Sequence, residues 1–472
     1  MVTIDVLPED VLIKIFGFYV IGYHHLNIIM VISGNQDMIK KILSWQTLVH
    51  VCRRWRDLVF ESPRGLGLQL CCTTVTLAKE TLDIWPALPL LIQCDVDETS
   101  ADNVIDVLEH SDRICQMGLH FRTTSQIETI WTAMQVPFLE LASLYLSYKD
   151  LPHGPVLPDS LLGGSAPRLR FLCLDSIPFP IVPNRLLSAA HLVHLWLLNI
   201  PHSAYVLPEA MANFLAMLTS LVQFLLGFES PQSRPDQQNR PLPPPTRTVL
   251  PALTSFSFKG DNEYLEELLA RITTPRLHQL YTTFFNDIHF DIPELVQFIT
   301  LTFEAPKDAR VVFESRVAGV ALQRFGQAPS FVDVAVKISC RVPDWQLSSL
   351  AQICTSCLPF LSATENLHIN EGLKSQLDWE DAIENSEWLE LLLPFTAVKD
   401  LYLSKQFTPR IAPALQEFAR GGRTEVLPTL QNIFLEGFQP SEPVHEGIEQ
   451  FISARQLSNG PIAISVWERD PE

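Results

Sequence analysis

The chain has 472 residues, 47% of them hydrophobic, and its 53 acidic residues outnumber 34 basic ones to give a formal net charge of −19. This length exceeds the usual size of one compact core, so we expect several domains or one extended repeat array. The negative charge repels phosphate backbones and anionic lipids, and therefore argues against nucleic acid and membranes as partners.

The sequence also indicates the compartment. Asp5, Glu9 and Asp10 stand where a secretory signal would be basic, and the most apolar long stretch, 13–32, is interrupted by polar residues. The chain contains 9 cysteines, an odd number, without the spacing of a disulfide framework. We therefore expect a soluble intracellular protein, cytoplasmic or nuclear, with reduced thiols.

Two amphipathic segments near the N-terminus predict a small helical bundle. Pro8 suits a first helical turn, and Glu9 and Asp10 complement the positive end of the helix. The apolar residues that follow have helical spacing: Val11, Leu12, Ile15, Phe16 and Tyr19. A second segment repeats this spacing with Leu48, Val51, Cys52, Trp55, Leu58 and Val59.

These two segments resemble the F-box, in their Leu-Pro pair at 7–8, their paired apolar residues at 11–12 and 15–16, and the Val-Cys-Arg-Arg-Trp run at 51–55. The resemblance covers 1–66, with a longer interval than usual that we interpret as an insertion at about 20–44. F-box proteins dock on a Skp-family adaptor, which joins them to a cullin–RING ubiquitin ligase. The resemblance implies these adaptor-binding residues: Leu7, Pro8, Val11, Leu12, Ile15, Phe16, Leu48, Val51, Cys52, Trp55 and Leu58.

A short pattern recurs after residue 111, in which an apolar residue is followed three and five positions later by two more. Its copies begin roughly every 30 residues, as in leucine-rich repeats, and the interval from 277 to 331 fits two units. Each copy predicts a strand. They begin at Ile114, Leu141, Leu169, Leu192, Leu221, Leu253, Leu277 (truncated), Phe331, Thr364 (degenerate), Val398 and Leu430.

Helical segments between these strands are expected at 208–218, 262–272, 293–301, 386–393 and 412–420. Alternation of strand and helix predicts parallel pairing and an α/β solenoid of the leucine-rich-repeat type, a horseshoe. We assign 67–110 to a linker and first solenoid cap, and 111–472 to the solenoid. The solenoid contains a Pro-rich loop at 230–251, whose Pro-Leu-Pro-Pro run at 241–244 could alternatively bind an SH3 or WW domain.

The sequence carries no motif for catalysis or cofactor binding. It has no nucleophile elbow, phosphate-binding glycine loop or HExxH zinc motif. Cys354 and Cys357 form a single CxxC without further ligands, so we interpret both thiols as small core residues. The histidines at 24–25, 191 and 194 lie among leucines, and we interpret them as core or rim residues rather than metal ligands. We expect no metal, no cofactor and no intrinsic enzymatic activity.

The architecture as a whole resembles F-box proteins with a leucine-rich-repeat-like C-terminal region, a type numerous in mushroom-forming fungi. The resemblance implies a substrate-recognition subunit of an SCF-type ubiquitin ligase, which holds an unknown protein substrate on its repeats. Two alternatives remain: a repeat scaffold without a ligase, and a (β/α)8 enzyme. The eleven expected strands argue against a barrel of eight.

Overall fold

The structure is a computed structural model of the chain, and it forms two compact units. Unit 1 consists of Met1–Val206 with Met217–Leu221, and unit 2 of Leu207–Ala216 with Val222–Glu472. Most of the insertion expected at 20–44, most of the Pro-rich loop, Phe331 and the histidines at 24–25 lie outside the described residues. The described ranges are 7–20, 43–63, 65–74, 78–148, 155–179, 191–231, 246–285, 292–323, 332–340, 345–357, 359–372, 384–420, 426–438, 446–456 and 461–468.

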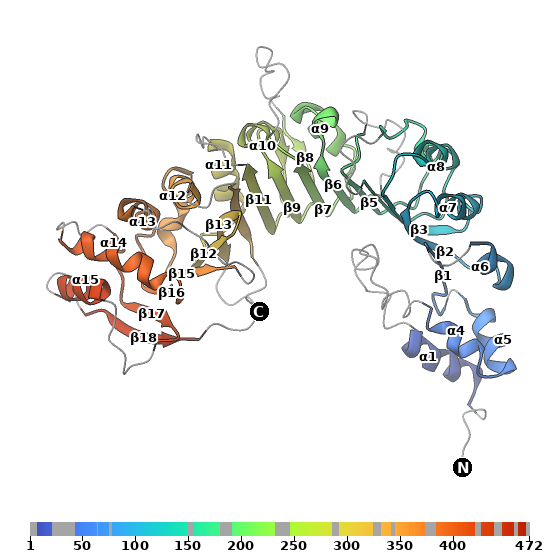
Figure 1. Ribbon diagram of the computed structural model, residues 1–472, viewed down its shortest axis with the longest axis horizontal. Coiled ribbons are helices and arrows are strands. Elements are labelled where there is room, and N and C mark those ends of the chain that lie inside the picture. Colours follow the sequence, from blue (N-terminus) through green and yellow to red (C-terminus); the bar gives the residue numbers. More distant parts are fainter. Residues whose placement is uncertain are drawn as a thin grey trace. The chain divides into compact units, whose positions relative to one another are not determined.

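Unit 1 begins with helices and continues as a parallel sheet (Figure 1). The N-terminal helices are α1 (Glu9–Val20), α4 (Trp45–Val49) and α5 (Arg53–Glu61). The strands pair in chain order: β1 (Leu70–Thr73), β2 (Leu90–Val96), β3 (Ile114–Phe121), β4 (Ser143–Tyr148), β5 (Phe171–Asp175) and β6 (His194–Ile200). They are connected through α6 (Ala78–Ile84), α7 (Ala101–Leu108), α8 (Ile127–Ala133) and the 3-10 turn η3 (Leu161–Gly164), and the 3-10 turn η5 (His202–Ala204) follows β6.

Unit 2 is a mixed sheet with its helices along one side (Figure 1). Its strands lie in the order β7 (Gln223–Phe228), β9 (Ser255–Gly260), β11 (Gln279–Phe285), β14 (Val334–Ser339), β13 (Val317–Gln323), β12 (Asp308–Glu314), β15 (Asn366–Glu371), β16 (Asp400–Leu403), β17 (Asn432–Glu436) and β18 (Ala463–Trp467). Two short strands, β8 (Thr248–Val249) and β10 (Ile272–Thr273), pair separately. The helices are α9 (Pro208–Leu215), α10 (Asn262–Leu269), α11 (Pro293–Thr302), α12 (Trp345–Cys357), α13 (Asn385–Leu392), α14 (Thr408–Arg420) and α15 (Glu446–Gln456), with the 3-10 turn η6 (Pro359–Ala363).

The recurring pattern explains how each repeat is held. Its first apolar residue precedes the strand by two positions and is buried, as at Leu141, Leu221 and Val398. The next two apolar residues lie on alternate strand positions, so both face the helices while the residues between them face away. Stacking of neighbouring repeats then removes the apolar faces from water, which gives a leucine-rich-repeat-like α/β fold.

One part of unit 2 departs from the expected parallel pairing. The interval from 277 to 331, expected to hold two ordinary units, contains the hairpin β12–β13, and β13 runs antiparallel to both β12 and β14. Strand β11 is also a full strand of 7 residues rather than a truncated copy. In this hairpin Ala309, Val311 and Phe313 bury one face of β12, while the residues between them are partly exposed.

The sheet also begins earlier than expected. Strands β1 and β2 and helix α7 fall within 67–110, the range assigned to the linker and first cap, and β1 already pairs in parallel with β2. The strand order in each unit runs from one edge to the other without closing on itself, which does not fit a (β/α)8 barrel. None of the described helices combines the length and apolarity needed to cross a bilayer.

Candidate functional site

The N-terminal helices pack through aromatic and arginine contacts. Helix α1 begins after Pro8, whose carbonyl accepts hydrogen bonds from the backbone of Val11 and Leu12. The rings of Phe16 and Trp55 lie 4.7 Å apart between α1 and α5. Arg54 of α5 donates a 2.9 Å hydrogen bond from Nη2 to the carbonyl oxygen that precedes Pro8. These contacts fix α1 against α5.

Helix α1 carries two apolar stripes rather than one. Leu12, Phe16 and Val20 recur every four residues and are buried. A second stripe, Val11, Ile15, Phe18 and Tyr19, lies on the neighbouring face and is largely exposed; 87% of Phe18 and 39% of Ile15 are accessible to solvent. We call this second stripe the α1 outer stripe. An exposed aromatic with apolar neighbours is typical of a docking surface.

The eleven residues implied by the F-box resemblance divide between core and surface. Four of them are buried in the bundle core: Leu12, Phe16, Leu48 and Leu58. Pro8, Ile15 and Val51 are exposed, and Leu7, Val11, Cys52 and Trp55 are partly buried. The ring of Trp55 packs against Phe16, and its Nε1 is buried without a hydrogen-bond partner. Much of this side chain therefore contributes to the bundle core. The surface that these residues offer to a partner is therefore smaller than the full set of eleven implies.

Phe18 was missed by the sequence analysis although the periodicity contained it. It follows Ile15 by three positions and Val11 by seven, which is helical spacing. Periodicity groups all these apolar residues on one broad face and does not show which edge of that face is buried. The packing of α5 against Phe16 decides this.

The helical bundle is joined to the sheet of unit 1 by a second aromatic cluster. Trp45 is fully buried, donates a 3.0 Å hydrogen bond from Nε1 to the carbonyl of Gln69, and lies 5.1 Å from the ring of Trp85. The ring of Phe60 lies 6.5 Å from that of Trp85. The bundle and the first strands thus share one core, and the helix that carries the α1 outer stripe is part of unit 1.

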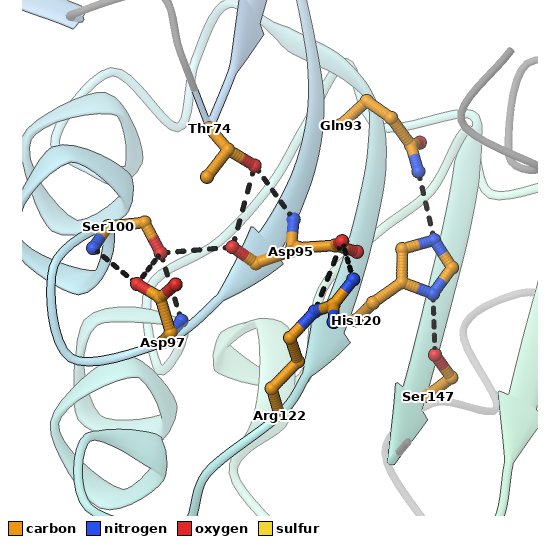
Figure 2. Close-up of polar contacts among 8 residues, drawn as sticks. All are labelled: Thr74, Gln93, Asp95, Asp97, Ser100, His120, Arg122 and Ser147. Atoms are coloured by element: carbon orange, nitrogen blue, oxygen red, sulfur yellow. Dashed lines mark hydrogen bonds and ion pairs between the residues drawn. The ribbon is translucent and has the colours of Figure 1, made fainter. Parts of the chain in front are cut away.

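The face of the unit 1 sheet opposite α7 and α8 carries polar side chains (Figure 2). Adjacent strands contribute Gln93 from β2, His120 from β3 and Ser147 from β4, joined by two hydrogen-bond contacts. Just beyond β3, Arg122 contacts the carboxylate of Asp95, with Nε 3.2 Å from Oδ2. The result is a continuous polar row across three strands.

His120 and Ser147 have the composition of a base and a nucleophile, but their arrangement favours a structural role. Nδ1 of His120 lies 2.7 Å from Oγ of Ser147, and Nε2 lies 3.0 Å from the side-chain nitrogen of Gln93. Both ring nitrogens of His120 are therefore engaged by neighbouring side chains of the sheet, as in a structural hydrogen-bond network. Gln93 and Ser147 are also almost fully buried.

A carboxylate organises the turn between β2 and α7 (Figure 2). Asp97 Oδ1 accepts hydrogen bonds from the side chain and backbone of Thr99 and from those of Ser100, at 2.7 to 3.0 Å. These donors lower the pKa of Asp97 to about 2. The turn is explained by local capping and does not indicate a ligand.

The corresponding face of unit 2 carries a stack of rings. His368, Tyr402 and Phe434 occupy matching positions on β15, β16 and β17, with ring centroids 4.1 and 4.4 Å apart and nearly parallel planes. Trp467 packs edge-on against the first two rings. Burial, with the charge of Arg310, lowers the pKa of His368 to about 4, so the imidazole is neutral at pH 7.

Most of the described thiols have the character of core residues. Burial raises the pKa of Cys71, Cys94 and Cys115 to about 12, so these thiols stay protonated and unreactive at pH 7. Within the described residues, no group of three or more histidine, cysteine or acidic side chains is arranged to hold a metal ion. Cys354 of the CxxC pair is buried in α12.

Comparison with known proteins gives limited likeness. No family model matches the sequence, and no curated protein matches it. Among solved structures, the chain is similar to the leucine-rich repeat-containing protein LegL7 from Legionella pneumophila, with 12% sequence identity and a TM-score of 0.30, over 70% of this chain and 94% of that chain. The strand register of this chain itself gives the leucine-rich-repeat-like fold, an architecture that serves as a protein-interaction scaffold.

Proposed function

We propose that this chain is the substrate-recognition subunit of an SCF-type ubiquitin ligase, which docks on a Skp-family adaptor through its N-terminal helices and holds a protein substrate on its repeats. One observation carries the proposal: α1 presents Ile15, Phe18 and Tyr19 to solvent although the neighbouring face of the same helix is already packed into the bundle. A helix that only caps a sheet needs one apolar stripe, which packs on that sheet. A second, exposed apolar stripe is typical of a helix that also binds another protein.

The F-box resemblance supplies the identity of that protein. Pro8 and Ile15 lie on the motif and at the surface, and Phe18 extends the same helix face. In this proposal the chain performs no chemistry. It holds a lysine of the substrate near a ubiquitin-charged enzyme, which raises the effective concentration of the reacting groups.

The proposal is tested by co-purification of the complete chain with a Skp-family adaptor. The variant Ile15→Ser/Phe18→Ser removes two apolar contacts that each contribute about 1 to 2 kcal/mol when buried, so we expect adaptor affinity to fall at least tenfold. Leu301→Ser is the matched control, because this residue of α11 is 75% exposed and lies in unit 2. Capture of the double variant at the native level would count against adaptor docking.

A second candidate is a repeat scaffold without a ligase, with the helical bundle as a cap on the sheet. The burial of Trp45 and its contacts with Gln69 and Trp85 favour it, because they join the bundle to the first strands. The same co-purification separates the two candidates. A scaffold of this kind should co-purify with protein partners that bind its repeats, and not with the adaptor.

A further inference from the structure

The sheet face of unit 2 that points away from the helices contains an unusual pair of lysines. Lys259 of β9, Thr283 of β11 and Lys337 of β14 occupy matching positions on three adjacent strands. All three are partly buried. The lysines are two strands apart, so their Cα atoms are separated by about 10 Å across the sheet. We call this set the lysine row.

Among the described residues, no carboxylate neutralises the lysine row. Neither Lys259 nor Lys337 forms an ion pair with any described residue, whereas Lys307 and Lys399 in the same unit both contact Glu365. The contrast is informative in a chain with 53 acidic residues. Two positive charges are retained on one face of a protein whose net charge is strongly negative.

Local packing holds both lysine side chains in place without cancelling their charge. The ammonium of Lys259 lies 5.6 Å from the ring centroid of Phe285, a cation–π contact. The stem of Lys337 lies over Gly319 of β13, where an added Cβ would approach its Cγ to 2.7 Å. Glycine also pairs with Lys259 on the other side, at Gly227 of β7. The row is therefore flanked on both sides by strand positions without side chains.

We propose that the lysine row binds an acidic segment of a protein partner in an extended conformation. Alternate residues of an extended strand lie about 7 Å apart on one face, so two carboxylates at every second position can each reach one of two long lysine side chains whose stems start about 10 Å apart. The hydroxyl of Thr283 lies between the two lysines and can donate to the same ligand. The partner is thus defined by the pattern Glu/Asp-x-Glu/Asp.

The inference rests on the part of the proposed function in which the repeats hold a protein, and not on adaptor docking. Its test contains no adaptor. Failure of adaptor capture therefore leaves the lysine row unaffected, and failure of the lysine row leaves adaptor docking unaffected.

The test measures fluorescence anisotropy of a labelled peptide of five Glu-Ser repeats with the purified complete chain at low salt. We expect saturable binding that weakens about tenfold in Lys259→Gln/Lys337→Gln, because two charge contacts are lost. Arg276→Gln/Lys405→Gln is the matched control, since both residues are exposed in unit 2 and the charge change is equal. This control should bind within twofold of the native chain. Lys259→Arg/Lys337→Arg, which keeps the charge, should retain binding, which identifies the positive charge as the property that the peptide recognises.

Four results would overturn the inference: no saturable binding by the native chain at millimolar concentration, unchanged binding by the lysine-to-glutamine variant, equal losses in this variant and its control, or equal binding of a Gln-Ser peptide. A ten-thymidine oligonucleotide and phosphatidylserine vesicles test other anionic partners. Tighter binding of either, lost through the same two lysines, would also overturn it.

Discussion

Gly118 of β3 offers a quantitative test of the polar row in unit 1. A Cβ added at this position would lie 3.0 Å from Cδ and 3.3 Å from Nε2 of Gln93, with the amide oxygen closer still. The Gln93 side chain therefore lies directly over the glycine. Because Gln93 is only 7% exposed and contacts His120, an alanine at 118 must displace a buried, hydrogen-bonded amide.

The cost of this displacement follows from two opposing effects. Separating Gln93 from His120 leaves a buried polar group unsatisfied, which costs about 1 to 3 kcal/mol. Alanine reduces the conformational freedom of the unfolded chain relative to glycine, which returns about 0.4 to 1 kcal/mol. We therefore expect Gly118→Ala to lower the free energy of unfolding by about 1 to 2 kcal/mol.

A double-mutant cycle isolates the contact between the two residues. In a Gln93→Ala background the obstructing amide is absent, so Gly118→Ala should be neutral or stabilise the protein by up to about 1 kcal/mol. Urea unfolding followed by circular dichroism, with the dependence on denaturant checked for each variant, gives the four free energies. An equal cost of Gly118→Ala in both backgrounds would refute the packing of Gln93 over this glycine.

Three further predictions concern the bundle and the ring stack. Phe16→Ala should destabilise the protein by about 3 to 5 kcal/mol because it empties a core site, whereas Phe18→Ser should change stability by less than about 0.5 kcal/mol; thermal unfolding compares the two. Trp45→Phe should cost about 1 to 3 kcal/mol through loss of the hydrogen bond to Gln69, measured by urea unfolding, and an unchanged midpoint would contradict that contact. His368 stays neutral down to about pH 4 in the folded state but gains a proton near pH 6.5 when the chain is unfolded. The free energy of unfolding should therefore fall as the pH drops from 6.5 to 4, and His368→Gln should reduce this dependence on pH.

The sequence pattern was sufficient for the ordinary repeats. Leu141 and Leu253 each predict a strand that begins two residues later. In each repeat this buried loop residue and two alternating residues of the strand must all be apolar, which gives a recognisable pattern. The β12–β13 hairpin lacks that preceding leucine, so a search for the repeat passes over it. Its alternation at Ala309, Val311 and Phe313 was present in the sequence but describes any half-buried strand.

The candidate surfaces were harder to predict than the strands. The spacing of Val11, Ile15 and Phe18 is visible in the sequence, yet only the packing of Trp55 against Phe16 shows that this side of α1 stays open. The lysine row depends on strand register. Two lysines far apart in the sequence become neighbours because β14 pairs directly with β11, and the intervening hairpin lies on the other side of β14.

Radical footprinting of the complete chain with a Skp-family adaptor tests the central claim most directly, since it reports side-chain exposure on α1. We predict that adding the adaptor lowers oxidation of Phe18 and Tyr19, which are exposed in the free chain, and leaves oxidation of the exposed Trp345 of α12 unchanged. Undiminished oxidation of both α1 aromatics, whether a complex forms or not, would contradict it.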